Sequence, residues 1–157
     1  TWADTILMMD LTAGKLEWKA APQPFRRRAL IAAAHDGRMF AMGGIDAEGA
    51  VSAEVNIYNP ATGLWTKGPT LPGAGMNTFA PAACVHRGRL YVSLADGVIH
   101  RLDESARRWI EAGRATPRIA HRMAPAGDRM FVIGGASGGA NLDRIDAVEP
   151  AQTRDRP

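Results

Sequence analysis

The chain has 157 residues, of which 46% are hydrophobic and 22% are charged, and its formal net charge is +3. Its apolar runs, such as residues 29–34 and 39–44, have the length of strands and are far shorter than the roughly 20 residues of a membrane-spanning helix. Nucleic-acid-binding surfaces typically interleave aromatic residues with basic ones, and this sequence lacks that pattern. We therefore expect neither a membrane nor a nucleic acid among the partners of this protein.

The first predicted elements are two short apolar strands within residues 1–25, and the second of them begins near Trp18. The next unit, residues 26–72, alternates apolar runs with turn residues in a pattern that predicts four strands. Their expected ranges are 29–34, 38–42, 55–58 and 64–67. The opening pair of strands corresponds to the third and fourth strands of this unit.

The same pattern continues along the chain. Residues 73–116 predict four strands again, with Asp96-Gly97 as a two-residue hairpin in which both positions need a positive φ. Residues 117–150 predict an incomplete unit, and residues 151–157 are a polar tail. The equivalent second-strand segments read HDGRMFAMGG, HRGRLYVSLA and AGDRMFVIGG, at 35–44, 86–95 and 126–135.

Tryptophan marks the last strand of the units, because Trp18, Trp65 and Trp109 recur at intervals of 47 and 44 residues. A period in the forties that is built from short strands is typical of a β-propeller blade, a unit that cannot bury both its faces alone. The sequence therefore predicts an all-β propeller fold with roughly three four-stranded antiparallel blades.

These units resemble kelch repeats, and the resemblance covers about residues 3–150. It implies that each repeat is a four-stranded blade whose glycine pair ends the second strand. The third unit departs from the pattern, since Leu94-Ala95 stands in place of the glycines. The motifs that carry the resemblance are the glycine pairs, a tyrosine before a turn and a spaced tryptophan: Gly43-Gly44, Gly134-Gly135, Tyr58 before Asn59-Pro60, and Trp65.

Roughly thirteen strands are little more than three blades, and propellers usually close with four to eight. We therefore expect an incomplete ring with open sheet edges, which favour pairing with another chain. Two explanations stay open, namely a piece of a longer propeller or self-association of separate copies. The chain begins within a repeat and shows no leader, so we expect it to be truncated at that end and leave its cellular location unassigned.

Arg26-Arg27-Arg28 is the strongest candidate for a binding site, and Arg27 and Arg118 occupy the same position of their repeats. The resemblance implies that arginines there point into the mouth of the central channel, where some kelch domains bind acidic peptides through guanidinium–carboxylate pairs. We predict Arg27, Arg28 and Arg118 as ligand-binding residues. The alternative is that they tie the blades together by donating to loop carbonyls. Thr78 would interrupt such an arginine ring.

His121 is the fourth predicted binding residue, because it follows Arg118 at the start of an innermost strand. A structural hydrogen bond is its alternative role. We expect His35 and His86 to be exposed turn residues that are too far apart to share a metal. Four carboxylates are expected to be solvated loop charges: Asp46, Glu48, Asp143 and Asp146.

The sequence contains no convincing catalytic set. Ser137 lies in a G-x-S-x-G pattern, and nucleophile-elbow chemistry requires a histidine later in the chain than the serine. The last histidine is His121, so this requirement is not met. The single cysteine, Cys84, lies in an apolar run and is expected to be a buried, inert thiol. We therefore predict no catalytic residue, no cofactor and no metal.

The favoured function is a non-enzymatic kelch-repeat binding or scaffold module. It would present the loops 45–53 and 136–141 and the channel-mouth arginines to a peptide, protein or glycan, with acidic ligands the natural match for arginine. The alternative is a fragment of a kelch-type carbohydrate-active enzyme. The resemblance would then imply a sialic-acid isomerase or a copper radical sugar oxidase whose catalytic residues lie largely outside this chain.

Overall fold

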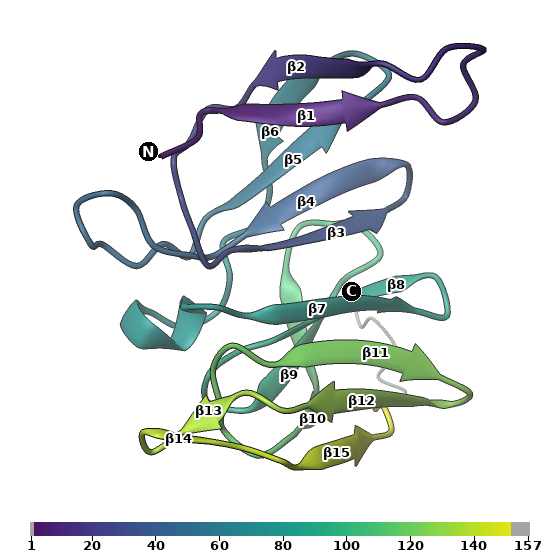
Figure 1. Cartoon of the computed structure of the whole chain (residues 1–157). Coiled ribbons are helices and arrows are strands. Elements are labelled where there is room, and N and C mark those ends of the chain that lie inside the picture. The colour runs from purple at the N-terminus through teal and green to yellow at the C-terminus, as the bar shows by residue number, and fades with distance from the viewer. Residues whose placement is uncertain (1, 152–157) are drawn as a thin grey trace.

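The computed structural model describes residues 2–151, which form antiparallel sheets stacked side by side (Figure 1). Each main sheet corresponds to one repeat and is called a blade below. The expected all-β fold is confirmed. Blade 1 contains β1 (Thr5–Met9) and β2 (Trp18–Pro22); blade 2 contains β3 (Ile31–His35), β4 (Arg38–Met42), β5 (Val55–Asn59) and β6 (Leu64–Lys67); blade 3 contains β7 (Ala82–His86), β8 (Arg89–Ser93), β9 (Val98–Leu102) and β10 (Trp109–Arg114); blade 4 contains β11 (Arg122–Ala126), β12 (Arg129–Ile133) and β15 (Ile145–Val148).

Every strand of a blade pairs with the next blade strand in the sequence. Blade 2 has the order β3-β4-β5-β6, and blade 3 has the corresponding order from β7 to β10. The first hairpin of blade 2 turns at Asp36 and Gly37, whose φ angles are 49° and 66°. Positive φ at both central residues matches the right-handed twist of the flanking strands. Each repeat therefore folds by local pairing.

The hydrophobic core lies between neighbouring blades. One cluster joins blades 2 and 3 and includes Phe40, Leu90 and Val92, whereas a second joins blades 3 and 4 and includes Tyr91 and Met130. Successive side chains of a strand point to opposite faces. Strand β8 therefore supplies Leu90 and Val92 to one cluster and Tyr91 to the other, which explains why a blade depends on its neighbours.

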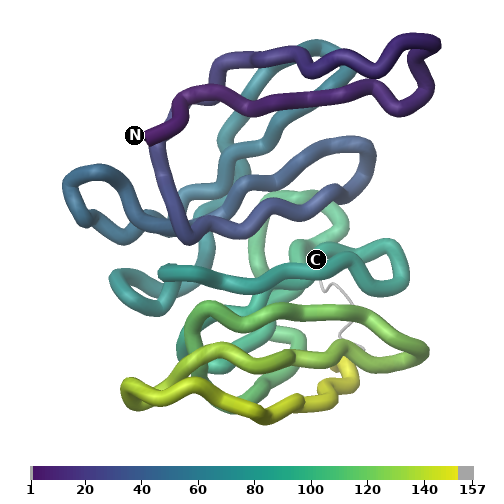
Figure 2. Tube along the Cα trace, in the orientation of Figure 1, coloured from purple at the N-terminus to yellow at the C-terminus, as the bar shows by residue number. Residues whose placement is uncertain are grey.

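The stack has two different ends, which appear on the right and the left of Figures 1 and 2. The hairpin end carries the tight turns that join the first strand to the second in blades 2, 3 and 4. The loop end carries the connections between second and third strands, which are long in blades 2 and 4 and short in blade 3, and the connections between successive blades. One of these connections contains the 3-10 helix η1 (Gly75–Thr78).

Close backbone packing at the loop end explains the glycine pairs. Gly44 and Gly135 both have a φ of +95°, and a Cβ atom on either would lie 2.6 Å from a carbonyl oxygen, that of Arg28 or Ile119. Only glycine accommodates both the left-handed backbone and this approach. The connection before each first strand can therefore lie directly against the end of the second strand.

The recurring tryptophans join successive blades. The Trp65 indole Nε1–H donates to the carbonyl oxygen of Pro22 at 3.0 Å, and the Trp109 indole donates to that of Pro69 at 2.9 Å. Each bond connects the last strand of a blade to the chain at the end of the preceding blade. Trp18 is 67% exposed, since no blade precedes blade 1 among the described residues.

Asp96-Gly97 does not form the predicted two-residue hairpin. The Gly97 N–H donates to the Leu94 carbonyl at 3.0 Å, and Gly97 is the only residue of the pair with a positive φ, at 80°. A turn followed by a glycine in the left-handed region is the three-residue hairpin with a bulge. The Asp96 carboxylate supports it by accepting from the Val98 N–H at 2.9 Å.

Blade 4 differs from the sequence-based expectation in its loop. Strands β13 (Ala136–Ser137) and β14 (Ala140–Asn141) pair there as a short hairpin of their own. Of the predicted polar tail, residues 152–157 lie outside the described residues. Ala151 is described, and its N–H donates to the Ala112 carbonyl of blade 3 at 2.8 Å.

Apolar side chains are exposed at both flanks of the stack. Leu7 and Trp18 of blade 1 are 65% and 67% exposed, and Ile145 of blade 4 is 61% exposed. The equivalent faces of inner blades pack against a neighbour. The described residues therefore form part of a propeller, and its open flanks agree with the expected incomplete ring.

Candidate functional site

Arg118 is buried within blade 4, with 1% of its side chain exposed. Its guanidinium donates to the carbonyl oxygens of Thr116, Gly134 and Arg144 at 3.0–3.2 Å and to Asp146 Oδ2 at 2.5 Å. These acceptors belong to the connection before β11, the end of β12 and the region where β15 begins. Arg118 therefore clamps three segments of one blade.

Arg27 forms the equivalent clamp in blade 2. Its Nη1 donates to Ser52 Oγ at 2.9 Å and to the Glu54 carbonyl at 3.1 Å, and its Nη2 donates to Asn56 Oδ1 at 2.5 Å. Asn56 takes the place of Asp146, because each pairs with the residue after the second-strand phenylalanine. The arginine clamp is thus repeated in the two blades. Its side-chain partner is an amide in blade 2 and a carboxylate in blade 4.

Both guanidiniums donate to acceptors of their own blade, and the buried Nε of Arg27 is left without a partner among the described residues. The contacts with loop carbonyls agree with the structural alternative, but each arginine ties segments of its own blade together and not neighbouring blades. A ligand would have to displace several hydrogen bonds to reach Arg118. The ligand-binding role of Arg27 and Arg118 stays a prediction, and their observed contacts support the loops around them.

Asp146 is the carboxylate partner in the Arg118 clamp, and the expectation that it is a solvated loop charge is wrong. Only 9% of its side chain is exposed, and it accepts from Arg118, from Arg144 and from the Thr116 N–H. Burial alone would raise the pKa of the Asp146 carboxyl, but these hydrogen bonds and the arginine charge lower it to about 2. A sequence signal existed, since Asn56 and Asp146 are polar residues at one repeat position between apolar neighbours.

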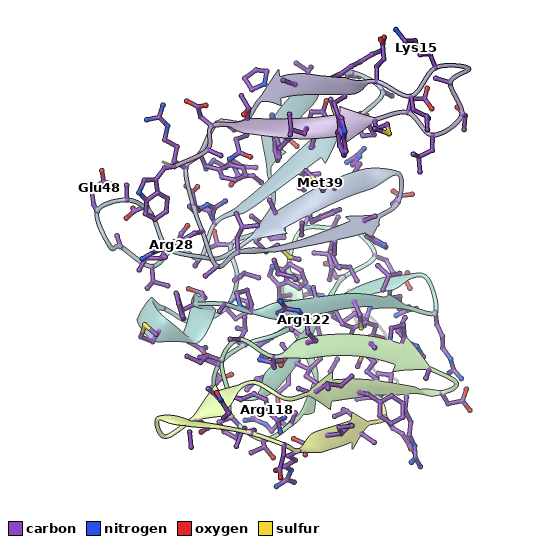
Figure 3. All side chains as sticks on the ribbon, viewed as in Figure 1. Lys15, Arg28, Met39, Glu48, Arg118 and Arg122 are labelled. Atoms are coloured by element: carbon purple, nitrogen blue, oxygen red, sulfur yellow. The ribbon has the colours of Figure 1, made fainter. Side chains whose placement is uncertain are left out.

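Arg28 differs from the other two arginines. Its backbone is held by paired hydrogen bonds with Ile45 at 2.9 and 3.0 Å, whereas its side chain makes no hydrogen bond or ion pair with a described residue. The guanidinium lies 5.2 Å from the ring centroid of Trp2, in a cation–π contact. Figure 3 shows Arg28 at the loop end, on the same side as Glu48 of the loop 45–53. Arg28 is therefore an exposed cation whose backbone is fixed by Ile45 and whose guanidinium lies against Trp2.

The positions equivalent to Arg28 in the other blades are apolar. Phe79 in blade 3 and Ile119 in blade 4 are both half-buried, and Met76 of η1 is 56% exposed nearby in the chain. A pocket of about 280 Å³ lies beside Ile119 and is also lined by Ala95, Ser137 and Gly139. The loop end therefore combines the exposed guanidinium of Arg28 with apolar surface.

His121 is buried, with 1% of the residue exposed, and neither ring nitrogen has a hydrogen-bond partner among the described residues. Burial disfavours the charged imidazolium and lowers its pKa to about 4, and the charges of Arg118 and Arg122 act in the same direction. Leu30 and Pro81 occupy the equivalent position in blades 2 and 3. His121 therefore fills an apolar position, and its predicted ligand contact stays a prediction.

The expectation that the turn histidines are exposed is wrong for His86, which is 4% exposed, and His35 is half-buried. Both are the last residues of first strands and face an aromatic ring of the second strand. The ring centroids lie 5.9 Å apart for His35–Phe40 and 6.4 Å apart for His86–Tyr91. This inward contact explains their burial.

The remaining candidates have local roles. Asp46 Oδ1 accepts from the backbone N–H groups of Glu48 and Ala50 and so shapes its loop. Ser137 lies in the β13–β14 hairpin, whereas a nucleophile elbow requires a strand-to-helix turn. Cys84 is buried, and burial raises the pKa of its thiol to about 11, as expected for an inert thiol.

Two features are absent from the described residues. No group of three or more His, Cys, Asp or Glu side chains is placed to hold a metal ion. No helix within residues 2–151 combines the length and the apolar character needed to cross a membrane.

Comparisons with known proteins agree with this architecture. Residues 26–72, which are blade 2 with its connections, match the Kelch motif family. The chain is 29% identical to human Kelch-like protein 35 over 114 residues, which are 69% of this chain and 19% of that protein. It is 32% identical to human Kelch-like protein 33 over 89 residues, or 52% of this chain and 16% of that protein.

A solved structure has the same fold. The structure of YjhT superposes with a TM-score of 0.76 and 20% sequence identity, over 97% of this chain and 60% of that one. The chain thus spans less than a fifth of the length of the curated relatives and 60% of the solved chain. With its repeated strands, glycine pairs and blade-joining tryptophans, this chain carries a match to the Kelch motif family at residues 26–72, and its described residues have the fold of a partial kelch propeller.

Proposed function

We propose that this protein is a non-enzymatic kelch-repeat binding module whose loop end recognises an acidic segment of a protein partner. The observation that carries the proposal is Arg28, an exposed guanidinium on a fixed backbone with no hydrogen-bond acceptor within residues 2–151. Loops on a rigid scaffold are common places for recognition, and arginine pairs well with carboxylates. The curated relatives are Kelch-like proteins, which supports protein binding in general terms.

The neighbouring positions add a preference for apolar side chains beside the acid. Phe79, Ile119 and Met76 lie at the same end of the stack as Arg28. The clamps of Arg27 and Arg118 hold the backbone of these loops from within the blades. A segment with a carboxylate and an adjacent apolar residue therefore matches this surface best.

Fluorescence polarisation with a labelled peptide that contains two glutamates and one phenylalanine tests the proposal. We expect Arg28→Ala to weaken binding roughly five- to tenfold, as for a charge-assisted hydrogen bond. Arg26→Ala is the matched control, because Arg26 is an exposed neighbour paired with Asp4. Equal affinities of the native chain and Arg28→Ala would contradict the proposal.

A thermal-shift experiment separates the carbohydrate alternative from peptide recognition. N-acetylneuraminate and neutral monosaccharides are added to the native chain, and the shift in melting temperature is compared with that from the peptide. We expect a shift with the peptide alone, because ligands stabilise the folded state that binds them. A shift with a sugar alone would instead favour a carbohydrate-binding or carbohydrate-active protein.

A further inference from the structure

A groove of about 650 Å³ opens at the hairpin end, opposite the loop end, between blades 2 and 3. Its volume lies within the range of protein sites that bind small molecules or short segments. The apolar part of its lining includes Phe40, Val85 and Leu102. The charged or polar part of the lining comprises His35, Asp36, Arg38, Arg87, Arg89 and Glu104, with Asp103 beside them.

Arg38 differs from the arginines at the same repeat position in blades 3 and 4, because the described part of the chain gives it no ion-pair partner. Each of the blades 2–4 begins its second strand with an arginine: Arg38, Arg89 and Arg129. Arg89 pairs with Glu104 at 2.8 Å, and Arg129 pairs with Glu149 at 2.9 Å. In blade 2 the corresponding acidic positions are Asn59 and Pro60, and Arg38 forms no ion pair or side-chain hydrogen bond with a described residue. The equivalent guanidiniums of blades 3 and 4 are neutralised by a glutamate, whereas that of Arg38 is available in the groove.

The junction of blades 3 and 4 explains why the groove exists. There the Arg87 guanidinium pairs with Asp128, so an ion pair bridges two neighbouring hairpins. The residue of blade 3 equivalent to Asp128 is Gly88, which has no side chain to reach blade 2. Asp36 of the blade 2 hairpin is also without an ion pair or side-chain hydrogen bond among the described residues. The groove is thus open, and Arg38 and Asp36 supply it with a positive and a negative charge that no other described side chain neutralises.

We propose that this groove binds a short peptide segment of a protein partner, in which an acidic and a basic side chain flank an apolar residue. The acid pairs with Arg38, the base pairs with Asp36, and the apolar side chain contacts Phe40, Val85 and Leu102. Charge complementarity argues for this ligand class. A neutral sugar would leave both charges unpaired, and a nucleic-acid strand would bring phosphate against Asp36. The site is separate from the loop end and does not depend on the function proposed there.

Three blocked pentapeptides with a central leucine test the groove. In the mixed peptide a glutamate and a lysine flank the leucine, in the dibasic peptide two lysines do, and in the diacidic peptide two glutamates do. Binding is followed by NMR through the backbone amides of Gly37 and Gly88, which line the groove. We expect the native chain to prefer the mixed peptide over each of the others by roughly fivefold.

Charge reversal should exchange these preferences. We expect Arg38→Glu to prefer the dibasic peptide and Asp36→Arg to prefer the diacidic one. Arginine at position 36 suits the turn, since Arg87 occupies the equivalent position with a φ of 50°. Arg129→Glu, at the same repeat position but outside the groove, is the matched control and should keep the native preference.

Two results would overturn the inference. One is the absence of amide shifts at Gly37 and Gly88 with millimolar mixed peptide. The other is an unchanged preference in Arg38→Glu when its melting curve shows a folded protein. Arg28→Ala should leave groove binding unchanged, so failure of this site and failure of the loop-end proposal give different results.

Discussion

Blade 2 and blade 4 use the same arginine clamp with different chemistry. Arg27 donates to the Asn56 amide, whereas Arg118 donates to the buried carboxylate of Asp146. Blade 2 has a fourth strand with Trp65 that joins it to blade 1, and blade 4 has three strands among the described residues. The difference shows that a repeat preserves geometry more strictly than charge, so equivalent substitutions should have unequal effects in the two blades.

The largest expected difference comes from removing each clamp. Arg118→Ala leaves the buried Asp146 carboxylate with Arg144 as its remaining cation and should lower the free energy of unfolding by about 3–5 kcal/mol. Arg27→Ala leaves a neutral amide and should lower it by about 1–3 kcal/mol. Urea denaturation of the two variants at pH 7 measures both values. Equal losses of unfolding free energy in the two variants would show that the Asp146 carboxylate stabilises its clamp no more than the Asn56 amide does.

The second comparison concerns His121 in blade 4 and Leu30 at the equivalent position in blade 2. The folded-state pKa of His121 is lowered to about 4 from an unfolded value near 6.5, so the unfolded state binds the proton first. Stability is therefore lost as the pH falls from about 6.5 to about 4, by up to roughly 3 kcal/mol. His121→Leu should remove this loss and leave stability above pH 7 nearly unchanged. An unaltered slope of unfolding free energy against pH would contradict the inference.

Asp146 should act in a lower pH window. Its folded-state pKa is lowered to about 2, and its ordinary value is near 3.8, so its contribution is complete above pH 4 and disappears as the pH falls toward 2. The contribution amounts to about 2 kcal/mol. Asp146→Asn reproduces the amide of blade 2 and should flatten the stability curve between pH 4 and pH 2. Acid titration followed by tryptophan fluorescence measures this, with Asp46→Asn as a loop control.

The smallest expected effect concerns the blade-joining tryptophans. Trp65→Phe keeps an aromatic ring but removes the N–H that donates to Pro22, and it should lower the free energy of unfolding by about 1 kcal/mol. Trp18→Phe should change it little, because that side chain is 67% exposed. Parallel denaturation curves test both variants. A larger loss in Trp18→Phe would mean that the flank of blade 1 is covered in solution.

Much of the architecture could be read from repeating residues. The glycine pairs, the second-strand aromatics and the tryptophans predicted the blades, because each type serves a local need that recurs in every repeat. The hairpin at Asp96-Gly97 was predicted wrongly, since turn composition alone does not distinguish a two-residue loop from a three-residue loop with a bulge. The hairpin of β13 and β14 is too short for a recognisable strand pattern.

The candidate site was less predictable. The position of Arg27 and Arg118 followed from the repeat, but their acceptors lie 16 to 29 residues further along the chain or in the adjacent connection. The burial of Asp146 and His86 depends on which neighbouring segments cover them, so their positions in the sequence had wrongly predicted exposed side chains. The opening between blades 2 and 3 depends on a pair of hairpins that face each other across a blade junction.

The sequence by itself determined the fold of this protein, because strand alternation, tight turns and repeated small or aromatic residues act over short distances in the chain. Tertiary structure alone decided which charges are available to a partner. Arg27, Arg28 and Arg118 are chemically identical, yet two of them satisfy carbonyl, amide or carboxylate groups of their own blade and the third faces solvent beside Trp2. A charge binds the nearest acceptor in space, and that neighbour is set when the blades pack.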